Sequence, residues 1–506
     1  MGDIEFIVLL LAAATVGVRF ADRASIPYPI VLVVFGLGLG LIPGLPQLEL
    51  DPDVVFLVFL PPLLHAAGWV ASPRELRTEV RPLAALAVGL VLVTTVAVAV
   101  VARALIPDMS WEAAFVLGAI VAPTDPVSAT ATFSRIGVPA RVRRLVEGEA
   151  MINDGTALVA YRVALTAALE GTFSPAGAAL DFVLAAGGGV LVGLAIGWAG
   201  TEIIRREQDV ALSVFVTILT AYAGYIVGEE LHVSGVLGAV VSGIYSGWKA
   251  PEAFSAEMRL TAIGFWRVLT FGLEALLFVL LGLQAPQLAE ELDIAPLAAQ
   301  ALAIALVVVG VRMAWALLPP VGAGDTVRER IAVGWSGMRG AISLAAALAV
   351  STDVAERPTI LLVTFGVIAV TLLGQGLTLP LVLRALRLQG ENRWAPDEAL
   401  ARLETAQAAL DRIEELEEAG ADEEPLDRLR DLYRMRFAQC VAALEGPDGD
   451  RPLNLPQLRN YGDLRRELIG VERRTLLAMR AADRVPPDVL RKVQRDLDLD
   501  EARLRV

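Results

Sequence analysis

The chain is poor in the residues that carry most metal, redox and nucleic-acid chemistry. Its 506 residues include one cysteine, Cys440, so neither an intrachain disulfide nor a cysteine-based metal site can form. The only histidines, His65 and His232, lie far apart, and zinc chemistry is not expected. The formal net charge of −14 is opposite to the basic footprint of nucleic-acid-binding proteins. We therefore expect no cofactor and no nucleic-acid partner.

Long apolar segments are abundant, and 55% of the residues are hydrophobic. A helix needs about 20 mostly apolar residues to cross a bilayer. The first such segment follows Asp3 and Glu5 rather than a basic stretch, so we interpret it as a retained helix and not as a signal peptide. Thirteen segments qualify as spans, at about residues 4–20, 27–45, 53–70, 82–103, 111–134, 142–169, 180–202, 210–228, 231–248, 262–285, 296–320, 329–351 and 358–386.

Basic residues are distributed unevenly over the loops between these spans. If the N-terminus faces outside, the cytoplasmic loops carry 15 Arg or Lys residues and the outer loops carry only Arg103 and Arg357. The positive-inside rule therefore predicts an external N-terminus and a cytoplasmic C-terminus. Abundant arginine beside only two lysines, Lys249 and Lys492, suggests a bacterial genome rich in G and C, and hence a bacterial inner membrane.

An odd number of spans allows two six-helix halves of opposite orientation, spans 1–6 and 8–13, with span 7 as the linker. Inverted repeats of this kind are common in secondary transporters, which bind their substrates near the bilayer midplane at interrupted helices. The predicted fold is thus an all-α membrane protein with two inverted repeats. Topology alone also permits a channel or a receptor.

The fifth span contains the segment Val121–Val127, with the sequence VAPTDPV. Pro123 and Pro126 bracket Thr124 and Asp125, and a proline both lacks an N–H and disfavours helix at the residue before it. We therefore predict an interrupted helix here. Asp125 is expected to line a cation site, to cap the second half-helix, or to do both.

The sixth span carries two acids at membrane depth. Glu149 and Asn153 are four residues apart and share a helix face, whereas Asp154 points about 140° away from Glu149. Because an intramembrane charge is costly, each acid needs a partner or a function. Asp154 lies deeper in the span and is the preferred cation and proton carrier, while Glu149 is expected to form a structural ion pair.

The twelfth span is rich in glycine around a buried arginine. Gly334, Gly337 and Gly340 surround Arg339, which predicts an unwound or closely packed segment. In the inverted-repeat arrangement this span corresponds to the fifth, so two interrupted helices should cross. Arg339 is the predicted partner of Glu149. The other intramembrane charges, Arg162, Arg267, Arg312 and Glu274, are interpreted as structural.

Six short stretches resemble the sodium–proton exchanger family, the electroneutral branch of the monovalent cation:proton antiporters. They run in the family's order and cover nearly all of the first 388 residues. The stretches are Phe59–Leu64, Thr124–Pro126, Glu147–Asp154, Ser234–Gly235, Leu280–Gln284 and Gly337–Gly340.

The resemblance implies thirteen helices, a homodimer and a mobile core that moves against a fixed dimerisation domain. It implies that Asp154 binds the cation, with Thr124 and Asp125 at the helix crossing and Asn153 beside it. It also implies the Glu149–Arg339 pair. Two positions depart from the pattern. Many relatives have an acid where this chain has Ala66, and a polar residue where it has Ala150.

A single carboxylate that holds either a proton or a cation is sufficient for antiport. Since Asn153 is neutral, one titrating acid remains, and we expect one-for-one, electroneutral exchange of Na⁺ or Li⁺ for H⁺. K⁺/H⁺ or broad monovalent cation exchange is the main alternative, and a cation channel a more distant one. An intramembrane aspartyl protease fits poorly, because Asn153-Asp154-Gly155 is not the Gly-x-Gly-Asp context of such enzymes.

The last part of the chain is charged and prone to form helices. We predict a transmembrane domain at 1–388 and a cytoplasmic helical domain at 389–506. Interruptions at Gly420–Pro425, Gly446–Gly449 and Pro486-Pro487 predict three or four short helices. A role in regulation, dimer contact or neither is compatible with this pattern.

Overall fold

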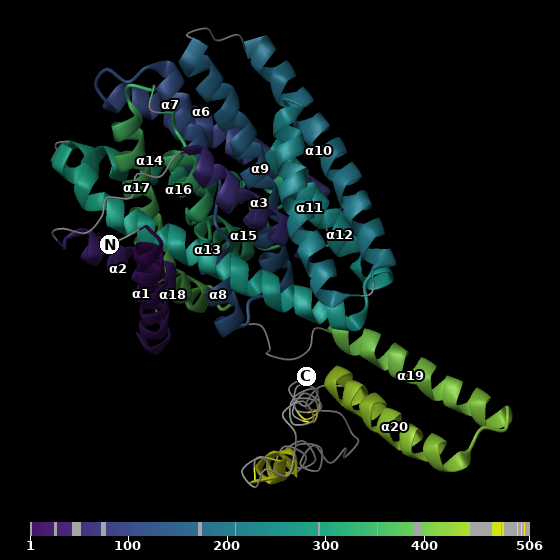
Figure 1. The fold of residues 1–506 in the computed structure, drawn as a ribbon. Coiled ribbons are helices and arrows are strands. Elements are labelled where there is room, and N and C mark those ends of the chain that lie inside the picture. The colour runs from purple at the N-terminus through teal and green to yellow at the C-terminus, as the bar shows by residue number, and fades with distance from the viewer. Residues whose placement is uncertain are drawn as a thin grey trace. The chain divides into compact units, whose positions relative to one another are not determined.

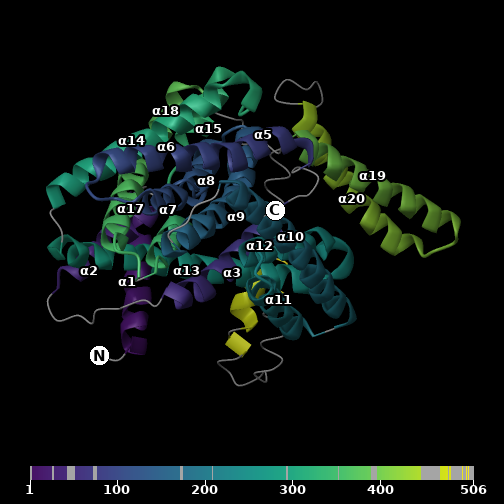
Figure 2. The same cartoon turned by 90° about the horizontal axis from the view of Figure 1, so that it is seen from above.

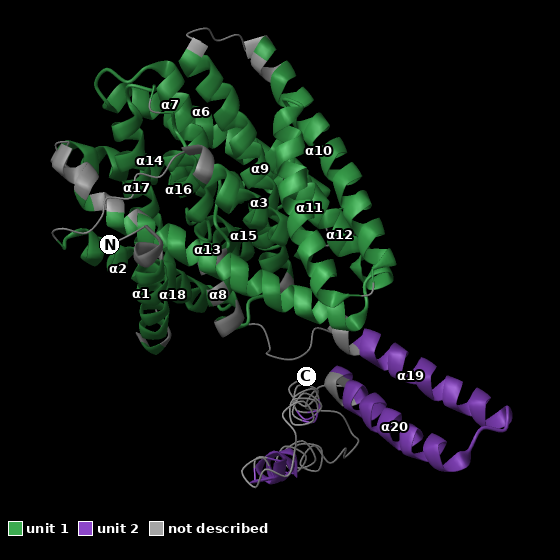
Figure 3. Ribbon diagram, viewed as in Figure 1, with its two compact units in different colours: residues 1–391 green, residues 392–506 purple. Residues whose placement is uncertain are grey.

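The computed structural model describes residues 3–24, 28–42, 52–71, 77–170, 175–207, 209–291, 294–351, 353–388, 396–445, 468–476 and a few further positions up to residue 500. These residues form helices and turns, with no strand among them. The chain forms two compact units, Met1–Glu391 and Asn392–Val506 (Figure 3).

Unit 1 contains a helix or a helix pair at each of the thirteen predicted spans (Figure 1). Nine of these are α1 (Asp3–Ala24), α2 (Tyr28–Gly40), α3 (Pro52–Val70), α9 (Ala140–Glu170), α10 (Pro175–Arg206), α11 (Val210–Glu230), α12 (Gly235–Ala253), α13 (Ala256–Glu291) and α14 (Ile294–Leu317). Two further spans are continuous helices with a π-helical turn, namely α5 (Val80–Ala84) joined to α6 (Leu90–Leu105) through Ala85–Gly89, and α17 (Arg357–Thr371) joined to α18 (Leu377–Ala385) through Leu372–Gly376. The last two are pairs of separate helices, α7 (Trp111–Val121) with α8 (Val127–Ile136) and α15 (Val327–Trp335) with α16 (Ala341–Leu348). The all-helical membrane fold predicted from the sequence is confirmed.

The fifth and twelfth spans are interrupted, as predicted. Ser110 caps α7 by accepting a hydrogen bond from the Ala113 N–H (3.2 Å), and the helix ends at Val121, just before the Pro123–Pro126 segment. Thr326 and Glu329 start α15 with a capping box, and this helix ends at Trp335 among the glycines. Each span thus consists of two half-helices joined by an extended segment.

Unit 1 is organised as two helix bundles. Helices α10, α11 and α12 lie side by side, α11 and α12 pack on α3, and α13 packs on α2 and α11 (Figure 1). We call α1–α3 and α10–α13 the long-helix bundle. In the view from above, α6, α14 and α17 lie together (Figure 2). We call α5–α9 and α14–α18, which include both interrupted spans, the broken-helix bundle.

Close glycine contacts hold the long-helix bundle together. A Cβ at Gly36 on α2 would meet the Val279 carbonyl of α13, and one at Gly282 on α13 would meet the Val33 carbonyl of α2. In lipid, helix association depends on such close packing rather than on the hydrophobic effect. The backbones of the two helices therefore lie in direct contact at these glycines.

Unit 2 contains an antiparallel pair, α19 (Pro396–Glu418) and α20 (Glu423–Glu445). Ala406 and Ile413 of α19 are buried together with Leu426 and Cys440 of α20, and Glu417 and Arg430 form an ion pair of 2.5 Å. The turn at residue 420 lies where the sequence predicted an interruption. The predicted interruptions at Gly446–Gly449 and Pro486-Pro487 lie outside the described residues.

Candidate functional site

The two interrupted spans cross in the broken-helix bundle. The extended segment after α7 lies against the one after α15, and the Asp125 N–H donates a hydrogen bond to the Met338 carbonyl (2.8 Å). Gly340 lies directly against the Asp125 carboxylate, because any Cβ there would collide with its Oδ2 and Cγ atoms. The crossing brings four helix ends together inside the membrane fold, where their free backbone groups need partners.

Two charged residues supply those partners. The Arg339 guanidinium, which is 1% exposed, donates to the Val121 carbonyl (2.8 Å), the Ala122 carbonyl (3.3 Å) and the Gly337 carbonyl, at the C-terminal ends of α7 and α15. The Asp125 carboxylate accepts a hydrogen bond from the Ala341 N–H (3.4 Å), at the first residue of α16. A cation at helix C-termini and an anion at a helix N-terminus both match the helix dipoles. Asp125 thus caps a half-helix of the other span.

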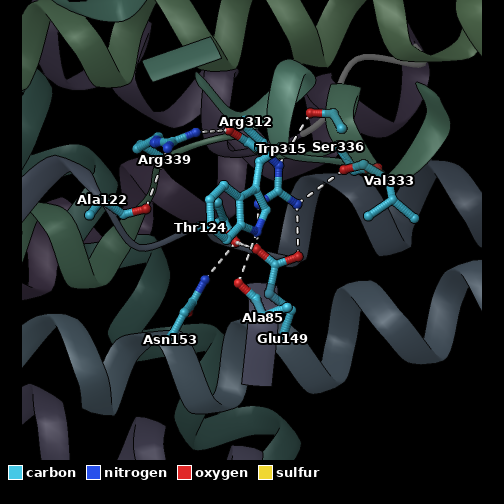
Figure 4. Close-up of polar contacts among 12 residues, drawn as sticks. Ala85, Ala122, Thr124, Glu149, Asn153, Arg312, Trp315, Val333, Ser336 and Arg339 are labelled. Carbon is cyan, nitrogen blue, oxygen red and sulfur yellow. Dashed lines mark hydrogen bonds and ion pairs between the residues drawn. The ribbon is translucent and has the colours of Figure 1, made fainter. Parts of the chain in front are cut away.

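The predicted ion pair of Glu149 with Arg339 was wrong. Glu149 pairs instead with Arg312 of α14, through Nη1 to Oε1 and through Nη2 to Oε2 (2.9 Å), and both side chains are 1% exposed (Figure 4). Arg312 also donates to the Val333 (3.0 Å) and Gly334 (3.2 Å) carbonyls. This bidentate geometry satisfies both charges in a dry interior. Arg339 is directed to backbone carbonyls and has no ion pair with the described acids.

A glycine explains why Arg312 can reach Glu149. A Cβ at position 337 would overlap the Cδ, Nε and Cζ atoms of Arg312, so Gly337 provides the space that the guanidinium occupies. The sequence contained one signal for this pair, namely an arginine in an otherwise apolar span. Two other arginines were interpreted as structural from the sequence. Arg162 pairs with Glu229 (2.5 Å), and Arg267 is exposed.

Thr124 connects the crossing to α9. Its hydroxyl accepts a hydrogen bond from the Asn153 Nδ2 (2.8 Å) and donates one to the Glu149 Oε1 (3.4 Å), as Figure 4 shows. Glu149 and Asn153 thus share a face, as their spacing predicted. Asn153 is not among the residues that line the cavity described next, and its Oδ1 atom is buried without a hydrogen-bond partner among the described residues.

Asp154 lines a cavity of about 330 Å³. Its carboxylate is 8% exposed and forms neither a hydrogen bond nor an ion pair with another described residue. Thr124, Asp125 and Gly340 line the same cavity, which extends along α9 to the exposed Arg144 and Glu147. Ten residues of helix separate Arg144 from Asp154, a distance of about 15 Å. A buried acid thus faces a path to the surface.

The cavity carries an excess of negative charge. Arg144 is the basic residue of its described lining, and the acids are Asp125, Glu147, Asp154, Glu274 and Glu79, of which Glu79 is paired with Arg141 outside the lining. A cleft of one sign of charge within low-dielectric walls concentrates counter-ions. Among the described residues, the site is therefore suited to small cations and unsuited to anions.

The two departures from the family pattern occupy different places. Ala150 lines the cavity and offers only a methyl group there. Ala66 packs instead on an apolar cluster that includes Phe254 and Trp266, and it is not part of the cavity lining. Of the two departures, Ala150 alone therefore lies in the described lining of the cavity.

The contact between Gly340 and Asp125 leads to a first prediction. Gly340→Ala should lower the exchange rate in proteoliposomes by about a hundredfold, because Asp125 must move from the α16 N-terminus and distort the crossing. Gly264→Ala in α13 is the matched control, since its Cβ would meet nothing within 4 Å, and it should retain the wild-type rate. Equal rates for Gly340→Ala and wild type would show that the crossing tolerates this shift.

Known proteins resemble this chain over most of its length. The sequence profile described as "Sodium/hydrogen exchanger, transmembrane" matches residues 7–385. A Mycobacterium tuberculosis protein named as an uncharacterized Na(+)/H(+) exchanger is 35% identical, over 98% of this chain and 95% of its own length. The Na(+)/H(+) antiporter ApNhaP of Aphanothece halophytica is 30% identical, over 81% of this chain and 79% of its own.

One further relative and one solved structure complete the comparison. A Bacillus pumilus protein named "Sodium, potassium, lithium and rubidium/H(+) antiporter" is 32% identical, over 74% of this chain and 60% of its own length. The sodium proton antiporter MjNhaP1 of Methanocaldococcus jannaschii has the same fold, with a TM-score of 0.62 and 22% identity, over 77% of this chain and 99% of its own. From its sequence, its interrupted helices and these relatives, we conclude that the chain belongs to the sodium/hydrogen exchanger family of membrane transporters.

Proposed function

We propose that the protein exchanges Na⁺ or Li⁺ for H⁺, one for one, by competition of the two ions for the Asp154 carboxylate. The observation that carries the proposal is a buried acid that has no described hydrogen-bond or ion-pair partner and lines a cavity shared with the exposed Arg144 and Glu147. An intramembrane charge without a protein partner is costly unless a proton or a cation neutralises it. Movement of an empty, charged Asp154 is therefore unfavourable, and this couples the two fluxes.

The ligands available to the cation are hard oxygen atoms. Thr124 and Asp125 line the cavity with Asp154, and the crossing lies beside them. Oxygen ligands suit alkali cations as they suit other hard cations. Because Ala150 contributes no polar group, backbone carbonyls and water would complete the shell.

Electroneutral exchange follows from the charges that stay fixed. Glu149 is compensated by Arg312, Asp125 caps the α16 N-terminus, and Asn153 is neutral. Asp154 alone then changes its occupant, and its proton-loaded and Na⁺-loaded forms carry the same charge. The proposal thus assigns the carrier role to one residue.

A second prediction tests this stoichiometry. An inward Na⁺ gradient should make the lumen of proteoliposomes alkaline, and an outward gradient should make it acidic. The rate of this pH change should be the same at every clamped value of the membrane potential. The measurement uses an internal pH dye with valinomycin and K⁺ to set the potential. A rate that changes steadily with the potential, or a sustained current carried by the exchanged ions, would overturn one-for-one exchange.

Broad cation exchange that includes K⁺ is the alternative that a relative favours. The name of the Bacillus pumilus relative includes four alkali cations, and the similarity covers 74% of the present chain. Dye responses to Na⁺, Li⁺ and K⁺, each added outside vesicles with an acidic lumen, separate the two cases. Equal responses would assign broad exchange, and cation flux without proton movement would indicate a channel.

The membrane setting is also part of the proposal. The distribution of basic loops supports an external N-terminus and a cytoplasmic C-terminus in a bacterial inner membrane. In this orientation the end of the cavity near Arg144 would face the cytoplasm. We assign transport to residues 1–388 and a cytoplasmic domain to residues 389–506, where 389–395 lie outside the described residues. A homodimer with the long-helix bundle as its fixed part completes this arrangement.

A further inference from the structure

A further intramembrane acid, Glu274, lines the same cavity from the opposite bundle. Glu274 lies in the middle of α13, a 36-residue helix of the long-helix bundle. It is half-buried and lines the cavity together with Asp154 and Asp125, which belong to the broken-helix bundle. The proposed exchange at Asp154 gives Glu274 no role, although its charge at this depth requires one.

The partner of Glu274 is a neutral hydroxyl. The Tyr28 hydroxyl of α2 donates a hydrogen bond to Oε2 (2.8 Å), and no described basic residue lies within ion-pair distance of the carboxylate. Glu149 shows what a purely structural acid looks like in this fold, since both of its oxygens are bound by Arg312. The Oε1 atom of Glu274 has no such partner among the described residues.

Tyr28 is itself held in place. Its ring lies 5.7 Å from that of Phe271, one turn before Glu274 on α13, and α2 packs closely on α13 through Gly36 and Gly282. The hydroxyl therefore fixes Oε2 from a rigid support and leaves Oε1 available to the cavity. A carboxylate with one oxygen anchored and one free is arranged to hold a cation weakly.

We propose that Glu274 is a transit site, which binds the entering monovalent cation through Oε1 before Asp154 receives it, and that Tyr28 positions Glu274 for this task. This inference rests on the exchange proposed at Asp154. Because Glu274 belongs to the bundle opposite Asp154, its charge does not move with the carrier and leaves the stoichiometry unchanged. It raises the cation concentration beside Asp154 instead.

The test compares Na⁺ dependence in proteoliposomes. Glu274→Gln should raise the apparent KM for Na⁺ by about tenfold, with little change in kcat. A tenfold change is the lower end of the increase in local cation concentration that a charged cleft produces. Tyr28→Phe should raise KM less, and Glu274→Asp should restore part of the loss. Adding choline chloride should reduce the difference between wild type and Glu274→Gln, because salt screens the attraction. Glu252→Gln, at an exposed acid paired with Lys249 on α12, is the matched control and should keep the wild-type KM.

Other outcomes would overturn the inference. A structural Glu274 predicts a lower thermal stability and a lower kcat with an unchanged KM. If Glu274→Gln fails to fold, Tyr28→Phe and Glu274→Asp decide by the same KM comparison. The transit site alone would be refuted if the Glu274 and Tyr28 variants kept the wild-type KM while wild type was active and Asp154→Asn was inactive. An inactive wild type would refute the exchange proposal and the transit site together.

Discussion

Asp154→Asn should reduce cation-driven proton movement to the level of protein-free liposomes. The amide has nearly the size of the carboxylate, so the packing of α9 is preserved, but it can neither bind a proton at accessible pH nor neutralise a cation. Since Asp154 forms no described ion pair or hydrogen bond, its loss should leave the protein folded. The measurement is dye-detected pH change in proteoliposomes, with folding checked by size-exclusion chromatography and thermal unfolding.

Asp181→Asn provides the matched control for this variant. Asp181 is an exposed acid on α10 and does not line the cavity, so the same chemical change there should leave the rate near that of wild type. Wild-type proton movement in Asp154→Asn would refute the carrier role. Loss of activity in both variants would show that the loss in Asp154→Asn is not specific to the cavity.

Arg312→Met should be the most destabilising single substitution among the buried charges. It leaves the Glu149 carboxylate, which is 1% exposed, without its counter-charge, and breaking a buried pair in this way costs about 3–5 kcal/mol. Thermal unfolding in detergent should show a large fall in the transition temperature, or loss of folded protein. The double variant Arg312→Met, Glu149→Leu should recover much of that stability, because no lone charge remains.

Arg339→Met is the comparison that tests the corrected pairing. It removes donors from the Val121 and Ala122 carbonyls and should also destabilise, but Glu149→Leu should not rescue it, because Arg339 forms no ion pair with Glu149. Rescue of Arg339→Met and not of Arg312→Met by Glu149→Leu would reverse the assignment. A double-mutant cycle on each pair gives the coupling free energy directly.

The features that could be predicted from the sequence are those set by local chemistry. Pro123 and Pro126 favour an interruption of the fifth span, and the glycines around Arg339 do the same in the twelfth, although α3 contains Pro61 and Pro62 without an interruption. The spans themselves follow from apolar length. These signals also identified Thr124, Asp125 and Asp154, which the fold brings to one cavity.

The features that could not be predicted depend on contacts between distant spans. Arg312 and Glu149 are 163 residues apart, and nothing near Arg312 indicates which way it points on α14. Its path to Glu149 is set by the space at Gly337, which is visible only when α14 and the crossing are packed. In the same way, the capping of α16 by Asp125 and the contact of Tyr28 with Glu274 join different spans.

Competition of Na⁺ and H⁺ at Asp154 is tested most directly by the uptake of radioactive Na⁺ with equal pH on both sides of the vesicle membrane. If both ions bind the same carboxylate, the apparent KM for Na⁺ should rise about tenfold for each unit by which the pH is lowered within the range where Asp154 is mostly protonated. The rate at saturating Na⁺ should stay constant. A KM that is independent of pH, with a maximal rate that falls as protons are added, would place the two ions at separate sites and contradict the account.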